Sequence, residues 1–408
     1  MDNSQLRNLF GFSRQAIRCV LASAIVLASI VLLKGLLQAQ AFTPFDVPGA
    51  GTGKNQGTLP VSINSAGMIT GFYYDANGLA HGFVRASDST ITSFDAPTSV
   101  KGTFAISINT GGQIVGFYLD AGENPHGFVR AASKPYKVTT FDASGAGTGT
   151  SPISINSLGQ ITGVWFDTAN VYHGFVRAAS KPYKVTTFDT PGAGTGTYQG
   201  TKPTNINTAG VVTGMYSDES YLYHGFVRAA DGTITPFSAP GASTGTAKLH
   251  RDLGTIPASI NTAGAITGSY TDAKDARHGF VRAADGTITT FSAAGAVTNR
   301  KVIQGTAGFS VNDSTIITGA YLDASGILQG FVRAADGTIT PFSAPGAANG
   351  PSLLKGTGGL SINETGYITG AYTDAKGVAH GYLLAPAAAT EARTALASSP
   401  GPSMSEAH

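Results

Sequence analysis

Residues 62–75 read Ser-Ile-Asn-Ser-Ala-Gly-Met-Ile-Thr-Gly-Phe-Tyr-Tyr-Asp, and residues 81–85 read His-Gly-Phe-Val-Arg. This pattern returns along the chain as far as residue 384, each time around a central asparagine that lies 45 to 54 residues from the next. A period of this length is typical of the blade of a β-propeller. The seven anchor asparagines are Asn64, Asn109, Asn156, Asn207, Asn261, Asn312 and Asn363.

Each copy of the pattern predicts four short strands separated by turn signals. In the first copy they fall at residues 61–64, 68–75, 81–85 and 90–94. Gly67 favours a tight first turn, because glycine adopts positive φ without steric cost. Beyond the N-terminal segment no stretch has the 3.6-residue periodicity of a helix, so the sequence predicts an all-β chain.

The spacing within the repeat is constant where the first three strands lie. The histidine, or the glutamine that replaces it once, follows the anchor asparagine by 17 residues in every copy. The linker from the fourth strand to the next repeat varies in length and contains glycine-rich runs such as residues 191–197. Variable loops on a constant scaffold usually carry binding specificity. We therefore expect a ligand on the face that carries these linkers.

The two ends of the repeat region complement each other. The last copy ends with residues 380–384 and lacks a fourth strand, whereas residues 42–46 form a spare strand of the same kind. Closing a propeller removes exposed sheet edges. The sequence therefore predicts a seven-bladed β-propeller of four-stranded blades over residues 42–386, with its ring closed by the N-terminal strand, which completes the last blade.

The N-terminus has the pattern of a targeting segment. Three arginines precede an uncharged, mostly apolar run at residues 19–33, and residues 39–41 read Ala-Gln-Ala. This order predicts a cleaved signal peptide over residues 1–41 and export to the extracellular space, the periplasm or the cell surface. An uncleaved anchor is the alternative, although the apolar run is shorter than the roughly 20 residues that a spanning helix needs.

Charge and cysteine content restrict the partners. The chain has 26 Lys and Arg against 24 Asp and Glu, and cleavage would remove four of the former and one of the latter, leaving a net charge of about −1. A near-neutral chain has no electrostatic footprint for nucleic acid. The only cysteine, Cys19, lies in the signal segment, so the mature chain would hold no disulfide. We expect a monomer without stable membrane insertion, with a disordered tail over residues 387–408.

The repeat resembles the HAF-type extracellular repeat of bacterial secreted proteins, written here as His-Gly-Phe, over residues 42–386. The resemblance implies a secreted, propeller-like repeat protein and no particular activity. The chain departs from its own pattern at Thr315 in place of glycine, Gln329 in place of histidine, Trp165 in place of tyrosine and Leu384 in place of arginine.

A repeated aspartate lies six residues before the repeated histidine. Such a pair could serve acid–base catalysis or bind a metal. The alternative is a hydrogen bond across each hairpin, which we prefer because a catalytic group is needed once per site and six histidines around a ring cannot converge on one ion. The predicted structural network is Asp75/His81, Asp120/His126, Asp167/His173, Asp218/His224, Asp272/His278 and Asp374/His380.

The repeated arginines also have two interpretations. They could line a surface that binds carboxylates or sulfates, or they could pack along the neighbouring blade, and we prefer the second. Loops of the form Asp-x-x-Gly bring one clear carboxylate each, too few for a calcium loop. We therefore expect no metal site and no cofactor.

Side chains that break the repeat are the better candidates for ligand binding. Most of them lie in the linkers and form a basic, polar set, whose alternative role is simply to be solvated surface charge. The candidates are His250, Arg251, Asp252, Arg300, Lys301, Lys355 and Trp165.

The sequence contains no His-Glu-x-x-His, P-loop or zinc-ligand spacing. We therefore assign no catalytic residue, and the preferred function is a secreted, non-catalytic binding or surface-interaction module that takes a glycan or an extracellular protein on the linker face. One alternative is a polysaccharide-active lyase or hydrolase on a propeller scaffold. The other is a structural protein of the envelope or matrix.

Overall fold

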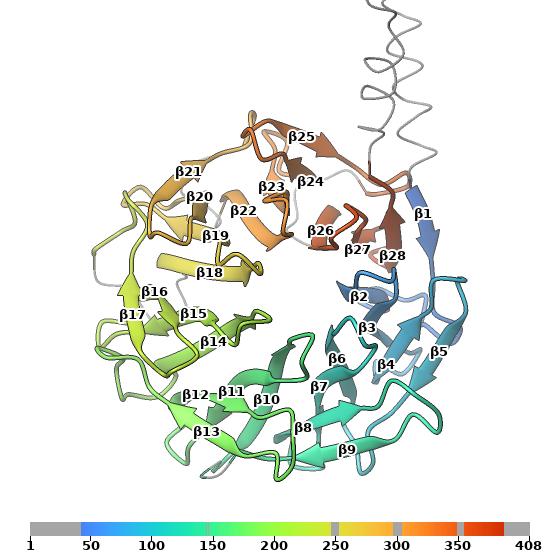
Figure 1. The fold of residues 1–408 in the computed structure, drawn as a ribbon. Helices are drawn as coiled ribbons and strands as arrows, with labels where there is room; N and C mark the ends of the chain where they lie inside the picture. The colour runs from blue at the N-terminus through green and yellow to red at the C-terminus, as the bar shows by residue number, and fades with distance from the viewer. Residues whose placement is uncertain are drawn as a thin grey trace, which may run out of the picture. The chain divides into compact units, whose positions relative to one another are not determined.

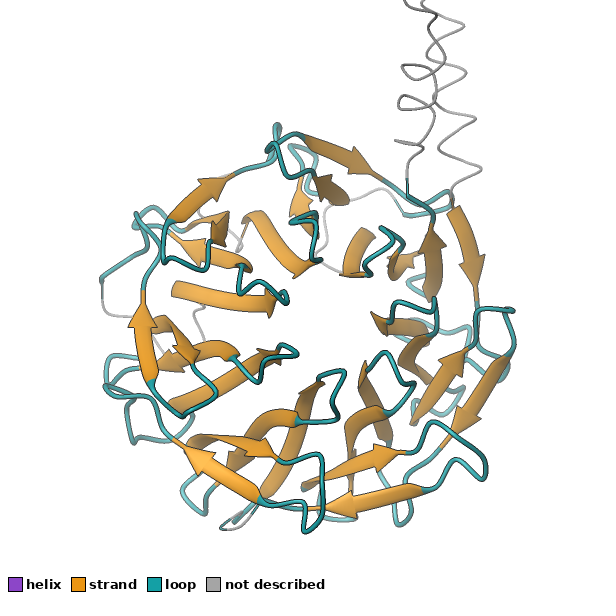
Figure 2. Cartoon of the chain, viewed as in Figure 1, coloured by secondary structure: helices purple, strands orange, loops and turns teal. Residues whose placement is uncertain are grey.

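The fold was analysed in a computed structural model, which describes residues 42–143, 145, 147–245, 253–296, 304–348 and 355–386. Contacts divide the chain into two compact units, Met1–Thr43 and Pro44–His408, and nearly all described residues lie in the second. The described ranges consist of strands and loops (Figure 2). They contain no helix able to cross a membrane.

The 28 strands form repeated blades, about seven in number, in which consecutive strands pair antiparallel (Figure 1). We number the repeats 1 to 7 by their first strands, which lie innermost in Figure 1. These first strands are β2 (Gly57–Ile63), β6 (Thr103–Ile108), β10 (Gly149–Ile155), β14 (Gly200–Ile206), β18 (Gly254–Ile260), β22 (Gln304–Val311) and β26 (Gly356–Ile362). The second strands are β3 (Ile69–Tyr74), β7 (Ile114–Leu119), β11 (Ile161–Phe166), β15 (Val212–Ser217), β19 (Ile266–Thr271), β23 (Ile317–Leu322) and β27 (Ile368–Thr373).

The two outer strands of a repeat are its third and fourth. The third strand carries the His-Gly-Phe sequence, and the fourth strand ends in another phenylalanine. The third strands are β4 (Ala80–Arg85), β8 (Pro125–Arg130), β12 (Tyr172–Arg177), β16 (Tyr223–Arg228), β20 (Ala276–Arg282), β24 (Leu328–Arg333) and β28 (Ala379–Leu384). The fourth strands are β5 (Ile91–Phe94), β9 (Val138–Phe141), β13 (Val185–Phe188), β17 (Ile234–Phe237), β21 (Ile288–Phe291) and β25 (Ile339–Phe342). The remaining strand, β1 (Phe42–Phe45), resembles these outermost strands in sequence.

The anchor asparagines join each repeat to the next. The amide Nδ2 of Asn64 donates to the carbonyl of Asn109 at 3.0 Å, and the bond recurs at 2.9–3.2 Å until Asn363 donates to the carbonyl of Asn64. The seven bonds therefore form a closed cycle. Each of the seven asparagines is at most 6% exposed, and a buried polar group left unpaired costs about 1–3 kcal/mol. The cycle thus fixes the contacts between neighbouring repeats.

A second cycle of hydrogen bonds runs beside the first. The hydroxyl of Ser62 accepts the backbone N–H of Ile108 at 3.4 Å, and equivalent bonds continue to Ser361, which accepts the N–H of Ile63 at 3.3 Å. In repeat 4 an asparagine, Asn205, replaces the serine and accepts the equivalent N–H through Oδ1. The substitution keeps the bond, so the requirement at this position is an acceptor oxygen.

The hydrophobic core lies between adjacent sheets. In repeat 3, Ile161 and Phe175 are fully buried and cluster with Val115 of repeat 2. Burying side chains of this size contributes about 1.5–3 kcal/mol each. The fully buried third-strand aromatics are Phe83, Phe128, Phe175, Phe226, Phe280, Phe331 and Tyr382.

The glycine of His-Gly-Phe provides room for an aromatic ring. A Cβ atom on Gly82 would lie 2.8 Å from the ring of Phe94, the fourth-strand phenylalanine of the same repeat. A Cβ atom on Gly381 in repeat 7 would lie 2.9 Å from the ring of Phe45. Phe45 therefore lies against Gly381 as Phe94 lies against Gly82.

The first strand of each repeat is longer than the sequence predicts. We expected residues 61–64 in the first copy, whereas β2 spans Gly57–Ile63. Gly57, at φ 109°, is the parallel bridge partner of Ala379, and a Cβ there would lie 2.0 Å from the Ala379 carbonyl oxygen. A bulge between Pro60 and Ser62 interrupts the alternation of side chains that would otherwise reveal the strand.

Thr315 is expected to weaken its own turn. Its φ is 61°, whereas the six equivalent glycines have φ between 77° and 88°. A residue with a side chain at this positive φ destabilises the folded state by about 1–2 kcal/mol relative to glycine. The greater backbone freedom of glycine in the unfolded chain offsets about 0.5–1 kcal/mol of this difference. T315G should therefore raise the free energy of unfolding in urea by about 0.5–1 kcal/mol. S314G, in the same turn without positive φ, should not stabilise, and an unchanged T315G would contradict this account.

Candidate functional site

The loops lie on two faces of the sheets. The first and third strands of a repeat run in the same direction, so the turns that follow them, such as residues 64–68 and 86–90, lie at one edge. We call this the turn face. Loops between the second and third strands, such as residues 75–79, lie at the opposite edge with the linkers, as the bond from Gly51 N–H to the Tyr74 carbonyl shows. We call this the linker face.

The repeated aspartate organises the loop in which it lies. Asp75 Oδ1 accepts the backbone N–H groups of Asn77 and Leu79, both at 2.8 Å, and the aspartate of every other repeat accepts two N–H groups in the same way. The bond from Leu79 contributes most to lowering the pKa of Asp75. These are the contacts of a turn in which a side chain replaces a backbone acceptor.

The repeated histidine is held from two sides. Its Nε2 lies 3.1–3.7 Å from Oδ2 of the preceding aspartate. Its Nδ1 lies 2.8–3.1 Å from a second acceptor directly after the fourth-strand phenylalanine, and its ring stacks on the second-strand tyrosine or tryptophan at centroid distances of 4.1–5.3 Å. The second acceptors of His81, His126, His173, His224, His278 and His380 are Asp95, Asp142, Asp189, Ser238, Ser292 and Asp46, respectively.

These second acceptors were missed by the sequence analysis. The signal for them is the aspartate or serine that follows the last phenylalanine of each repeat, including Asp46 after Phe45. Repeat 6 shows which contact is retained without a histidine, because Gln329 Nε2 donates to Asp323 Oδ2 at 2.9 Å. The arrangement joins three segments of a repeat at the linker face.

The geometry of these groups leaves little for acid–base chemistry. Both ring nitrogens of each histidine face an oxygen, and one ring face is covered by an aromatic side chain. Each histidine lies in a different repeat, so the rings do not converge on one point. In the part of the chain that the structure describes, no group of three or more His, Cys, Asp or Glu side chains is arranged to hold a metal ion.

The pKa of His126 is expected to lie above 6.5. Burial alone lowers it, but the hydrogen bonds to Asp142 and Asp120 outweigh burial, and the hydrogen bond from Asn124 leads those that lower the pKa of Asp120. Stabilisation from protonated His126 is complete below pH 6.5 and is lost as the pH rises through its folded pKa. The stabilisation from ionised Asp120 is complete above pH 3.8, the ordinary pKa of an aspartate. It is lost as the pH falls through the lowered pKa of the folded protein.

NMR titration of the His126 ring in the folded protein tests this directly. A midpoint above 6.5 that falls in the D142N variant is expected, because the variant keeps the shape of the acceptor and removes its charge. A wild-type midpoint at or below 6.5 would show that the two carboxylates do not outweigh burial.

Two of the asymmetric candidates lie in the described residues. Trp165 stacks on His173 with centroids 4.1 Å apart, and thus occupies the position of the repeated tyrosine. The Lys355 carbonyl accepts the N–H of Leu328 at 3.2 Å, just before β26. The two belong to different repeats, and the structure does not bring them together. The candidates His250, Arg251, Asp252, Arg300 and Lys301 lie outside the described residues.

The repeated arginines lie against the neighbouring repeat. The guanidinium carbon of Arg130 lies 4.9 Å from the ring centroid of Phe94 in the preceding repeat, and Arg85 lies 5.1 Å from that of Phe45. Similar contacts at 4.7–5.1 Å recur in four further repeats. This placement agrees with the packing interpretation, and such a contact contributes about 0.5–2 kcal/mol.

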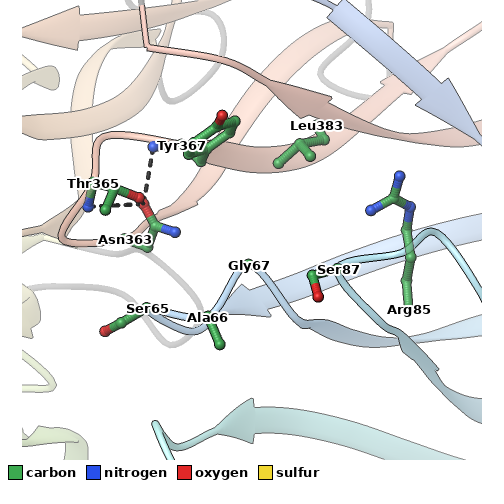
Figure 3. A pocket seen from close by; sticks show the side chains of 9 residues that line it. All are labelled: Ser65, Ala66, Gly67, Arg85, Ser87, Asn363, Thr365, Tyr367 and Leu383. Atoms are coloured by element: carbon green, nitrogen blue, oxygen red, sulfur yellow. Dashed lines mark hydrogen bonds between the residues drawn. The ribbon is translucent and has the colours of Figure 1, made fainter.

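A small depression on the turn face lies between repeats 7 and 1 (Figure 3). Its volume is 280 Å³, and Ser65, Arg85, Asn363 and Tyr367 are among its lining residues. Asn363 Oδ1 already accepts the backbone N–H groups of Thr365 and Tyr367, as the dashed lines show. The Asn363 side chain is therefore used by the turn itself, and we assign no ligand to the depression.

The repeated sheets and the closed hydrogen-bond cycles define a β-propeller. No family model matches the sequence, and comparison with curated proteins gives no match. Among solved structures, virginiamycin B lyase from Staphylococcus aureus is similar, with 13% identity and a TM-score of 0.51 over 84% of this chain and 99% of that protein.

Two weaker similarities accompany it. TolB from Acinetobacter baumannii has 9% identity and a TM-score of 0.41 over 78% of this chain and 63% of that protein. The fucose-binding lectin of Aleuria aurantia, a six-bladed β-propeller, has 13% identity and a TM-score of 0.39 over 74% of this chain and 98% of the lectin. Only the similarity to the lyase supports the fold, and none of the three carries an argument about activity.

Proposed function

We propose that the chain is an exported, seven-bladed propeller of four-stranded blades, in which β1 completes the repeat that ends with β28. The closed cycle of seven asparagine bonds supports the number of blades. Two contacts support the closure: Phe45 lies against Gly381, and Asp46 accepts from His380 Nδ1 at 2.9 Å. The HAF-type repeat and the signal-peptide pattern support a secreted protein.

Its proposed role is non-catalytic binding of a glycan on the linker face. One observation carries this: in every repeat the aspartate accepts two backbone N–H groups and each histidine Nδ1 faces a second acceptor, as in the contacts of Asp75 and His126. Recognition therefore falls to side chains that differ between repeats, which are concentrated in the linkers. Tyr198, in the linker before β14, is 44% exposed, and an exposed tyrosine can contact a sugar face while its hydroxyl hydrogen-bonds.

Retention of residues 42–408 on a panel of neutral and acidic polysaccharides, with and without calcium, tests this role. We expect selective retention on at least one of these polysaccharides that is lost when Arg251, Arg300 and Lys301 are changed together to alanine. Lys274→Ala, in a loop on the same face, is the matched control and should be retained like the wild type. Absence of retention on every glycan would contradict glycan binding, and release of shortened sugar would support the enzyme alternative.

A further inference from the structure

The turn face carries an uneven charge that the near-neutral composition hides. In repeats 2 and 3 the third-to-fourth turns are longer than elsewhere, and both read Ser-Lys-Pro-Tyr-Lys, at residues 133–137 and 180–184. They belong to an identical stretch of 17 residues that occurs at 126–142 and again at 173–189. No other repeat has this turn.

The two turns have the same conformation. Tyr136, at φ 55°, donates its backbone N–H to the Ser133 carbonyl at 2.8 Å, and Tyr183, at φ 57°, does so to Ser180 at the same distance. All residues from serine to the second lysine are exposed in both turns. The tyrosines are 38% and 40% exposed, although both are large apolar side chains. The chain thus displays the same lysine and tyrosine side chains twice. The strands that flank the two turns, β8 and β9 in repeat 2 and β12 and β13 in repeat 3, belong to neighbouring blades (Figure 1).

An arginine holds each of these tyrosines in place. The guanidinium carbon of Arg130 lies 4.4 Å from the centroid of Tyr136 and 4.9 Å from that of Phe94. Arg177 makes the same pair of contacts with Tyr183 at 4.4 Å and Phe141 at 4.7 Å. A ring that is already fixed loses little conformational entropy when a ligand stacks on its exposed surface.

Carboxylates are absent from the turn-face segments around this surface. The segments 109–113, 130–138, 156–160 and 177–185 contain six basic residues and no Asp or Glu. The equivalent segments of the other five repeats contain six carboxylates, at Asp88, Asp231, Asp285, Asp313, Asp336 and Glu364. Within the described residues, no lysine of the two turns forms an ion pair with a carboxylate. The positive charge of repeats 2 and 3 is therefore concentrated on one side of the turn face.

We propose that the two Ser-Lys-Pro-Tyr-Lys turns, which we call the Lys-Tyr surface, bind an anionic polysaccharide. Carboxylates of a uronate chain match lysine ammonium groups in charge, and the apolar face of a sugar ring matches an exposed tyrosine. An identical surface displayed twice fits a polymer that presents the same unit repeatedly, because the second contact then forms at high effective concentration. This surface lies on the face opposite the linkers and does not rest on the ligand proposed there.

Replacing the turns with the chain's own short turn tests the proposal. Repeat 4 has Asp231-Gly232-Thr233 where repeat 2 has residues 133–137, so each long turn can be exchanged for Asp-Gly-Thr on a backbone that the fold already tolerates. Wild-type protein should bind polygalacturonate and not neutral dextran, with affinity that falls as salt rises. The double exchange should weaken binding at least tenfold, and each single exchange should give an intermediate loss.

Two controls separate this surface from general charge and from the linker face. The first removes four exposed lysines from the linker face and should leave polygalacturonate binding unchanged; its substitutions are K54A, K101A, K274A and K376A. The second is the triple alanine variant of Arg251, Arg300 and Lys301, which should also keep polygalacturonate binding. Equal losses in these variants and in the double exchange would overturn the proposal.

A last comparison distinguishes a polysaccharide from an acidic protein segment. Y136S/Y183S keeps all lysines and removes both rings. It should weaken binding to polygalacturonate and leave any binding to poly-glutamate unchanged. Binding to poly-glutamate as tight as to polygalacturonate, with no effect of the tyrosine changes, would mean that the surface recognises acidic peptide and would overturn the assignment of a sugar ligand.

Discussion

Replacing Asn64 by alanine should destabilise the propeller by about 3 kcal/mol, because three hydrogen bonds are lost and buried backbone groups are left unpaired. The Asn64 amide donates to the carbonyl of Asn109 at 3.0 Å, and Oδ1 accepts the N–H groups of Ala66 and Met68 at 3.1 and 2.9 Å. The first bond connects two repeats and the other two close a turn. Urea unfolding of the variant measures their combined effect.

Asn64→Asp separates the two contributions. Aspartate keeps the acceptor for the turn but cannot donate to the Asn109 carbonyl when ionised, so this variant should lose about 1–3 kcal/mol. Asn77→Ala is the control, since Asn77 is an exposed asparagine whose side chain bonds Asp75 at 3.3 Å. It should change stability by less than about 0.5 kcal/mol. Wild-type stability of Asn64→Asp would mean that the cycle between repeats contributes nothing.

Truncating Phe45 to alanine should cost about 2–3 kcal/mol, less than the cost of a fully buried phenylalanine because its ring is half-buried. The ring packs against the cluster of Ile63, Ile69 and Phe83, and its centroid lies 6.1 Å from that of Phe83. It also supports the guanidinium of Arg85 at 5.1 Å. A terminal strand that did not belong to the ring would lose none of these contacts.

Phe94, the equivalent of Phe45 in repeat 1, is the matched comparison for the F45A variant. Phe94 lies against Gly82 and under Arg130 at 4.9 Å, as Phe45 lies against Gly381 and under Arg85. F45A and F94A should therefore lower the midpoint of thermal unfolding by similar amounts. A neutral F45A beside a destabilising F94A would contradict closure of the ring by β1.

The fold could be largely predicted because the sequence pattern repeats once per blade. The anchor asparagines, the turn glycines and the alternation of the second and third strands all recur with nearly constant spacing. The partners of these residues could not be predicted in the same way. The group that accepts the Asn64 amide lies 45 residues away, and only the placement of one sheet beside another identifies it. The start of β2 was also missed, because Gly57 is held by Ala379 at the far end of the chain.

The candidate site was predicted in part. The spacing between Asp75 and His81 predicted a hydrogen bond across a hairpin, but Nε2 of His81 lies 3.7 Å from Oδ2 of Asp75, too far for one. Among the Asp–His pairs the bond forms in repeats 2, 4 and 5. The second acceptor, Asp95, follows a different strand, and the aspartate or serine after the last phenylalanine of each repeat was not recognised as its signal. The Lys-Tyr surface was missed for another reason: net charge is a sum over the chain, so lysines of repeats 2 and 3 are cancelled by carboxylates of other repeats.

One measurement tests most directly whether recognition lies outside the repeated Asp–His set. All six repeated histidines are replaced by glutamine, the residue that repeat 6 already has at position 329, and the folded variant is compared with the wild type on the polysaccharide panel. The account predicts that both proteins are retained on the same polysaccharide to the same extent and that neither releases shortened sugar. Loss of retention in the folded variant, or release of shortened sugar by the wild type alone, would contradict it.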